Sequence, residues 1–233
     1  MKIPGTSVSE IRDFLAKMPL FSGLGDPSLM EIARLGKLVK YNKSQFVFSQ
    51  SDPSENFYII RSGDISILLG SADGRELVIN EMRMGDFLGE LGLLTKQPRS
   101  TSAVARIDSE LLVFPGHAFL KILDAEPLLV RRILEIIAHR LRSSTERESA
   151  LAFWDAQARL ARILLQLEKQ ETEKGYVTIS QEELAQRTGL TRQTAAKILG
   201  RWRRAGWLIT GRGHILLLKH AELSKLEKEW LIE

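Results

Sequence analysis

The 233-residue sequence contains no cysteine. Disulfide bonds, cysteine nucleophiles, cysteine-ligated zinc and iron–sulfur clusters are therefore excluded. No run reaches the ~18 consecutive apolar residues of a membrane-spanning helix, and the first ten residues, MKIPGTSVSE, lack the apolar core of a secretory signal. These absences predict a cytoplasmic protein that does not contact a membrane.

Acidic residues are missing from one long stretch, 184–221, although the net charge of the whole chain is only +4. Such a segment is typical of a surface that contacts the phosphate backbone of nucleic acid. A solvated basic face would carry the same charge, so charge alone does not decide. The cationic residues of this stretch are Arg187, Arg192, Lys197, Arg201, Arg203, Arg204, Arg212 and Lys219.

The four histidines are scattered along the chain, and none lies within 37–115. A metal-dependent enzyme built on a small barrel needs two or three histidines and a carboxylate that converge on the metal. The sequence therefore predicts no catalytic residues and no metal site, although haem ligation by a single histidine stays open.

Hydrophobic periodicity divides the chain into segments. Helical spacing covers 8–34, whereas short apolar runs separated by turn residues, as at 72–74, fill 37–115 and predict an antiparallel sandwich or barrel. A long helix is expected over 127–153, and further helices and a polar loop at 170–175 follow. We expect an α+β protein with three parts, 1–126, 127–153 and 154–233.

The helix expected over 127–153 has a broad apolar stripe that includes Val130, Ile133, Leu134, Ile137 and Leu141. A stripe of this width has more apolar surface than one neighbour covers. Packing against the chain's own barrel and against the same helix of a second copy would cover it, which predicts a homodimer. A core helix within a monomer is the alternative.

The C-terminal part has the order of elements of a winged helix-turn-helix. Ser180 and Glu183 form a capping box, Gly189 suits a tight turn with positive φ, and Thr191 can cap a second helix that runs to about Arg204. Two strand-like runs joined by Gly211-Arg212-Gly213 follow as a hairpin. Residues 222–233 resemble a short amphipathic helix that caps this domain or contacts a partner.

The second helix is expected to enter the DNA major groove by its N-terminal end. Arg192 suits bidentate pairing with guanine and Gln193 with adenine, while Lys197 can reach a base or a phosphate. Arg201 and Arg212 are predicted to contact phosphates, which position the protein without specifying sequence. Thr191 completes the predicted DNA-binding set.

The stretch 85–101, GDFLGELGLLTKQPRST, suggests an anion pocket. Gly89 lets the backbone approach a ligand, and residues 90–94 can form one helical turn whose N–H groups face an anion. Arg99 offers a planar double donor and Ser100 a hydroxyl, while Glu90 can accept from a ribose hydroxyl. From spacing alone, a structural loop with a Glu–Arg ion pair fits equally well.

This stretch resembles the phosphate-binding cassette of cyclic-nucleotide-binding domains, and residues 10–220 resemble the CRP/FNR family of bacterial transcription regulators. The resemblance implies an N-terminal antiparallel, jelly-roll-like β-roll, a dimerisation helix and a winged helix-turn-helix. It implies ribose binding by Glu90, cyclic-phosphate binding by Arg99 and Ser100, and backbone contacts near Gly89 and Leu91. In the cyclic-AMP-responsive members, an arginine and a Thr-Ser pair follow on the dimer helix.

Arg140 and the pair Ser144-Thr145 stand at those places, which implies cyclic AMP as allosteric effector, with no obligatory cofactor. The partners implied are palindromic double-stranded DNA, a second copy of the chain and, for an activator, RNA polymerase. Gln193 and Lys197 replace a Glu and an Arg of the family pattern, so we expect a relaxed or shifted preference, compared with the TGTGA half-site, at the base that the Glu would read. A cyclic dinucleotide, another nucleotide, ligand independence and a protein-interaction module remain alternatives.

Overall fold

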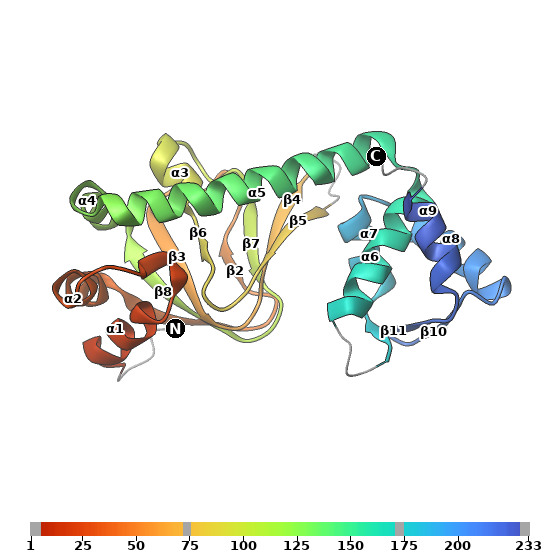
Figure 1. The fold of residues 1–233 in the computed structure, drawn as a ribbon, viewed down its shortest axis with the longest axis horizontal. Coiled ribbons are helices and arrows are strands. Elements are labelled where there is room, and N and C mark those ends of the chain that lie inside the picture. Colours follow the sequence, from red (N-terminus) through yellow and green to blue (C-terminus); the bar gives the residue numbers. More distant parts are fainter. Residues whose placement is uncertain (1–5, 72–75, 171–174, 229–233) are drawn as a thin grey trace. The chain divides into compact units, whose positions relative to one another are not determined.

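The computed structural model describes residues 6–71, 76–170 and 175–228, and the chain forms two compact units, residues 1–141 and 142–233. Helix α5 (Pro127–Phe153) begins in the first unit and ends in the second, as Figure 1 shows. Its bounds are those expected from the sequence. The division into 1–126, 127–153 and 154–233 stays a prediction.

The first unit contains two four-stranded antiparallel sheets, with strand orders β1-β8-β3-β6 and β2-β7-β4-β5. The short strands predicted between 37 and 115 are present, and the expected antiparallel β-roll is confirmed. The strands are β1 (Lys37–Tyr41), β2 (Phe46–Phe48), β3 (Asn56–Ser62), β4 (Ile65–Gly70), β5 (Glu76–Met82), β6 (Phe87–Leu88), β7 (Ser102–Ala105) and β8 (Ser109–Pro115).

Short helices cover one part of the roll and share its core. Phe57 of β3 stacks on Phe119 at 3.7 Å between ring centroids. The same apolar cluster includes Leu15, Phe21 and Ile133, so the N-terminal helices and the start of α5 pack on the sheets. These helices are α1 (Val8–Ala16), η1 (Pro19–Phe21), α2 (Asp26–Leu35), α3 (Glu90–Thr95) and α4 (Gly116–Ala125).

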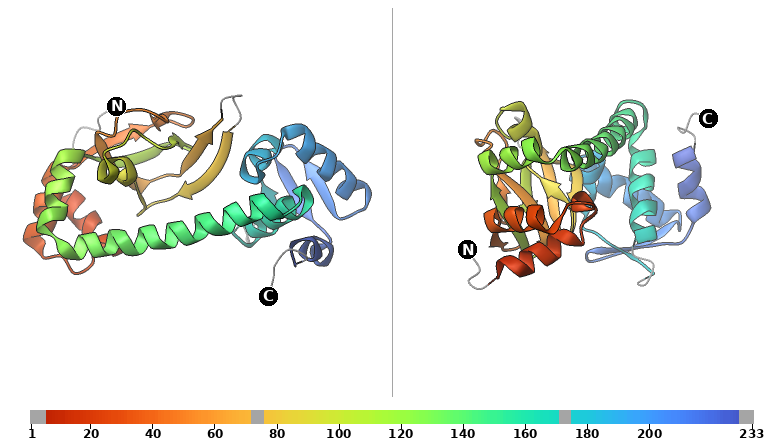
Figure 2. Two further views of the ribbon diagram at one scale, coloured as in Figure 1. Left: turned by 90° about the horizontal axis from the view of Figure 1, so that it is seen from above. Right: turned by 60° about the vertical axis from the view of Figure 1, so that its left-hand side comes forward.

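The apolar stripe of α5 is covered on one side only by its own unit. Leu129 and Ile133 are buried in the apolar cluster of the roll. Figure 2 shows the ribbon of α5 and of the roll from two further directions. Leu134 and Leu141 are 61% and 67% exposed. The homodimer that would cover these leucines stays a prediction.

The second unit contains a three-stranded antiparallel sheet, β10-β11-β9, packed with four helices around one apolar core. Asp155 precedes its first helix and accepts a hydrogen bond from the Ala158 N–H at 2.7 Å. The elements are α6 (Ala156–Gln170), β9 (Val177–Thr178), α7 (Gln181–Thr188), α8 (Arg192–Arg204), β10 (Leu208–Gly211), β11 (His214–Leu217) and α9 (His220–Lys228).

Three sequence predictions fall partly or wholly outside the described residues. They are the turn at 72–74, most of the polar loop at 170–175 and the end of the amphipathic helix at 222–233, including Trp230 and Leu231. The part that is described, α9, buries Leu223 in the core of the second unit.

Candidate anion pocket and nucleic-acid interface

Gly89 joins β6 to α3 with a left-handed backbone, φ +89°. A Cβ atom at this position would lie 2.7 Å from an Arg99 guanidinium nitrogen and 2.9 Å from the Asn56 carbonyl oxygen. Both the φ value and the close approach therefore require glycine. The helical turn predicted for residues 90–94 is present as α3.

Arg99 is buried, with only 5% of its surface exposed. Its two terminal nitrogens donate to backbone carbonyls, Nη1 to Gly89 at 2.7 Å and Nη2 to Asn56 at 2.6 Å. Its Nε is buried without a hydrogen-bond partner, and no carboxylate of the described residues forms an ion pair with it. Burial lowers the pKa of Arg99, because the charged form has lost hydration.

A buried cation without a counter-ion is costly unless an anion joins it. Two carbonyl bonds fix the orientation of the Arg99 guanidinium, and its Nε–H is an unused charged donor enclosed by the protein. An unused charged donor on a buried arginine is typical of a site for a small anion.

Glu90 forms an ion pair with Arg140 of α5, with 2.9 Å between Oε1 and Nη1. Glu90 is 6% exposed, and Arg140 also donates to the Phe87 carbonyl at 2.8 Å. Burial raises the pKa of Glu90, and the Arg140 charge opposes that shift. The sequence assigned both residues to one site, but it gave no signal that they pair across 50 positions.

The remaining residues of the predicted effector site are not all buried beside Arg99. Leu91 is 50% exposed and Ser100 is exposed. Ser144 and Thr145 belong to the part of α5 in the second unit, where the Ser144 hydroxyl lies 3.4 Å from a Glu148 carboxylate oxygen. Their approach to an effector stays a prediction.

Three residues beside Arg99 were missed by the sequence analysis. The Phe48 ring lies under the guanidinium, 4.4 Å from ring centroid to Cζ, and the Tyr58 ring lies at 5.6 Å. Asn56 contacts Arg99 through its backbone carbonyl, which any residue type would supply, and its side chain hydrogen-bonds Tyr58. Burial raises the pKa of Tyr58, and the nearby Arg99 charge opposes the rise.

The second unit contains the expected helix-turn-helix, α7 and α8. Ser180 caps α7 by accepting from the Glu183 N–H, and Thr191 caps α8 by accepting from the Thr194 N–H. Gly189 ends α7 with φ +64°. The predicted caps at Ser180 and Thr191 and the turn at Gly189 are therefore present.

Helix α8 is amphipathic in the way that a DNA-reading helix requires. Its buried side consists of Ala195, Ile198, Leu199 and Trp202. Arg192, Gln193, Lys197 and Arg201 are exposed, as is the cap Thr191. Within the described ranges, none of the three cations has an acidic partner. An unpaired cationic face is available to phosphates and base edges.

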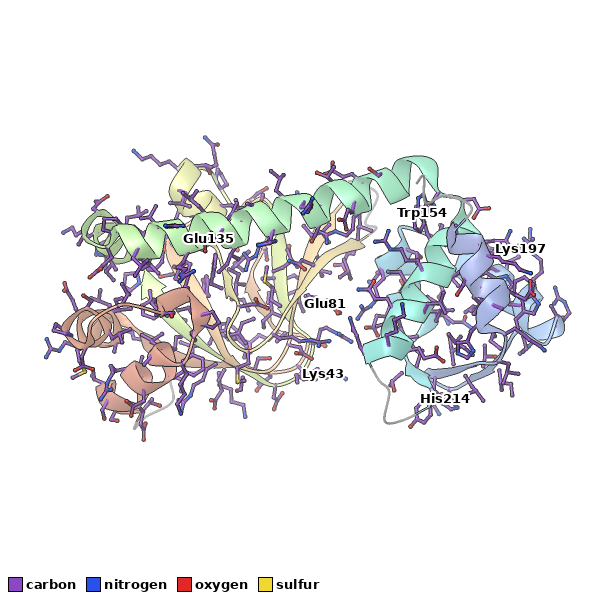
Figure 3. The ribbon with its side chains drawn as sticks, viewed as in Figure 1. Lys43, Glu81, Glu135, Trp154, Lys197 and His214 are labelled. Atoms are coloured by element: carbon purple, nitrogen blue, oxygen red, sulfur yellow. The ribbon has the colours of Figure 1, made fainter. Side chains whose placement is uncertain are left out.

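The hairpin β10–β11 turns at Arg212 and Gly213, and Gly213 has φ +77°. Arg212 is exposed at this tip. Figure 3 labels Lys197 on α8 and His214 on β11, the helix and the hairpin that carry these exposed cations. The predicted wing is therefore present.

The described part of the chain shows no cluster of three or more histidine or acidic side chains that could hold a metal ion. Within the same residues, no helix is long and apolar enough to span a membrane.

Two family models match the chain. Residues 38–126 match the cyclic nucleotide-binding domain, and residues 158–226 match the Crp-like helix-turn-helix domain. The first segment contains Gly89, Glu90 and Arg99, and the second contains the α7–α8 pair.

Bacterial relatives match most of this chain. The CRP-like cAMP-activated global transcriptional regulator of Mycobacterium tuberculosis is 29% identical over 84% of this chain and 90% of its own length. The cAMP-activated global transcriptional regulator CRP of Salmonella typhimurium is also 29% identical, and the match covers 75% of this chain and 86% of that protein. The c-di-GMP responsive regulator CLP of Xanthomonas campestris has a similar structure, with a TM-score of 0.77 at 25% identity. The match covers 83% of this chain and 99% of that protein.

Proposed function

The chain belongs to the CRP/FNR family of DNA-binding transcription regulators, and on that premise we propose that cyclic AMP gates its binding to palindromic DNA. The observation that carries the proposed effector is the buried guanidinium of Arg99, whose Nε has no hydrogen-bond partner and which forms no ion pair among the described residues. We assign the anion contact to Arg99 and Ser100, the ribose contact to Glu90, and backbone contacts to Gly89 and Leu91.

The balance of buried charge supports a singly charged phosphate. Glu90 and Arg140 neutralise each other, which leaves one positive charge on Arg99. A cyclic phosphodiester carries one negative charge, whereas a phosphomonoester carries about −1.5 to −2 at pH 7. The pocket is therefore expected to prefer a cyclic mononucleotide to AMP or ATP.

Gating requires that the effector prefer one arrangement of the two units. We propose a homodimer in which the exposed leucines of α5, Leu134 and Leu141, pack against the partner's helix. Ser144 and Thr145 would then meet the base of the effector. A coupling free energy of about 1–3 kcal/mol would change DNA affinity about 5–150-fold.

On DNA, we assign base contacts to Arg192, Gln193 and Lys197 and phosphate contacts to Arg201 and Arg212, with Thr191 at the start of the reading helix. Two such helices in a dimer, about 34 Å apart, would read a palindrome. We propose a cytoplasmic, non-enzymatic regulator that contacts RNA polymerase if it activates.

A cyclic dinucleotide is the second candidate effector, because a regulator described as c-di-GMP responsive has the structural similarity given above. A cyclic dinucleotide carries two phosphodiesters, and the described cassette offers one arginine, Arg99, that has no ion-pair partner. The charge balance therefore favours cyclic AMP.

Calorimetric titration with cyclic AMP, AMP and a cyclic dinucleotide tests the effector. We expect micromolar binding of cyclic AMP and binding at least tenfold weaker for AMP. The variant Arg99→Lys should bind cyclic AMP more weakly while keeping the charge. Binding of the dinucleotide and not of cyclic AMP would identify the dinucleotide as the effector. If no nucleotide binds to a folded protein that still binds DNA, the regulator is independent of these ligands.

A further inference from the structure

We propose that Phe48 of β2 is a positioning residue of the effector site, because its ring face fixes the plane of the Arg99 guanidinium for the incoming anion. The inference rests on the proposed binding of a nucleotide phosphate by Arg99. Phe48 lies outside the 85–101 cassette, and the sequence marks it only as one apolar residue of a short strand.

A guanidinium has two kinds of surface, a polar edge and a flat face. At Arg99, two terminal nitrogens on the edge are held by the carbonyls of Gly89 and Asn56. The face lies against Phe48, with 4.4 Å between the ring centroid and Cζ. Edge and face are then both fixed, and the unpartnered Nε–H keeps one direction.

The ring is itself held in place. Phe48 is 9% exposed, and its centroid lies 5.7 Å from that of Tyr58 in a tilted aromatic pair. Tyr58 lies 5.6 Å from the same guanidinium, so two aromatic rings line the cation. A cation near an aromatic ring is attracted by the negative ring face, and this attraction increases when water is excluded.

The same strand offers a matched control. Phe46 is 49% exposed, and it has no ring contact, ion pair or side-chain hydrogen bond within the described part of the chain. Both phenylalanines belong to β2 and are two positions apart. A change at position 46 therefore alters aromatic content and strand propensity without touching Arg99.

An aliphatic side chain at position 48 would keep much of the apolar volume and lose the negative face. We expect Phe48→Leu to lower the affinity for cyclic AMP about tenfold, which corresponds to about 1.4 kcal/mol. Phe46→Leu should leave the affinity unchanged within twofold. Trifluorophenylalanine at position 48 keeps the shape of the ring and weakens its negative face, so it should lower affinity without unfolding the protein.

The test combines calorimetry with an NMR measurement on the ligand-free protein. In the wild type, the ring should shift the Arg99 Nε–H resonance upfield, and Phe48→Leu should abolish that shift while Phe46→Leu preserves it. Thermal unfolding of each variant separates positioning from stability. A trifluorinated variant that binds cyclic AMP as tightly as the wild type would overturn the inference.

Failure of the proposed function gives a different result. If the wild type binds no cyclic AMP, the proposed effector and the role of Phe48 in binding it are both overturned. If the wild type binds cyclic AMP and Phe48→Leu binds it equally well, only the role of Phe48 is overturned.

Discussion

The two units use cationic side chains in opposite ways. In the roll, Arg99 is 5% exposed and held by two carbonyls and an aromatic ring. On α8 and the hairpin, Arg192, Lys197 and Arg212 are exposed and have no acidic partner among the described residues. A buried arginine binds one anion of defined charge and position, whereas exposed cations bind a polyanion through many salt-sensitive contacts.

The largest expected effect comes from displacing the buried cation. Gly89→Ala places a Cβ 2.7 Å from the Arg99 guanidinium and imposes a left-handed φ on alanine. We expect cyclic AMP affinity to fall about 100-fold, or about 2.7 kcal/mol, measured by calorimetry.

Gly85→Ala is the control for that experiment. Gly85 also has positive φ, +91°, but a Cβ there would meet nothing within 4 Å. The Gly85→Ala variant should therefore be less stable because of backbone strain, and its affinity for cyclic AMP should be nearly that of the wild type. Equal losses of affinity in the two variants would mean that strain, and not displacement of Arg99, is the cause.

The next largest effect is expected on the sequence specificity of DNA binding by the exposed residues of α8. Arg192→Ala should cost about 1–3 kcal/mol of discrimination at one base pair of each half-site, because a bidentate contact with guanine is lost. Arg201→Ala should weaken binding to all sequences alike. Measured affinities for operators with single base changes separate the two patterns, and uniform loss in Arg192→Ala would reassign Arg192 to a phosphate.

A smaller effect is expected at the hairpin tip. Arg212→Ala should reduce the slope of log affinity against log salt by about 0.9, since one phosphate contact disappears. Lys225→Ala removes the same charge from α9, where Lys225 already pairs with Glu222 at 3.3 Å, and should not change the slope. Fluorescence anisotropy across a salt series measures both slopes, and an unchanged slope for Arg212→Ala would remove Arg212 from the interface.

The smallest effect is a pH dependence of stability. Burial raises the pKa of Glu90 above 4.5, so the unfolded chain releases this proton before the folded chain does. The contribution of Glu90 to stability is therefore complete below pH 4.5 and decreases as the pH rises through the raised pKa. Denaturant unfolding of Glu90→Gln should lack this decrease.

The pKa of the exposed Glu135 is shifted in the opposite direction to that of Glu90. Hydrogen bonding to Arg132 lowers its pKa, so its contribution is present above 4.5 and decreases as the pH falls. Glu135→Gln should therefore keep the decrease that Glu90 causes. If the stability of the wild type increases with pH where the Glu90 contribution should decrease, the raised pKa assigned to Glu90 is contradicted.

Local signals predicted much of the fold. Ser180, Gly189 and Thr191 act within a few residues of their own positions, and their caps and turn are where the sequence indicated. The bounds of α5 followed from a long apolar period. Such features depend on near neighbours in the chain, so a single sequence contains them.

The interior of the site could not be predicted in the same way. Arg99 was assigned to the anion, but its partner Asn56 is 43 positions away and contributes a backbone oxygen that any residue would supply. Phe48 reaches Arg99 because β2 pairs with β7, and nothing in the run Phe46-Val47-Phe48 distinguishes the two rings. These contacts depend on the register of strands that are distant in sequence.

The most direct test of effector gating is the DNA affinity of the wild-type protein with and without saturating cyclic AMP. The proposed mechanism predicts at least about fivefold tighter binding to a palindromic operator when cyclic AMP is present. Equal affinities in the two conditions, in protein that calorimetry shows to be saturated with cyclic AMP, would contradict it.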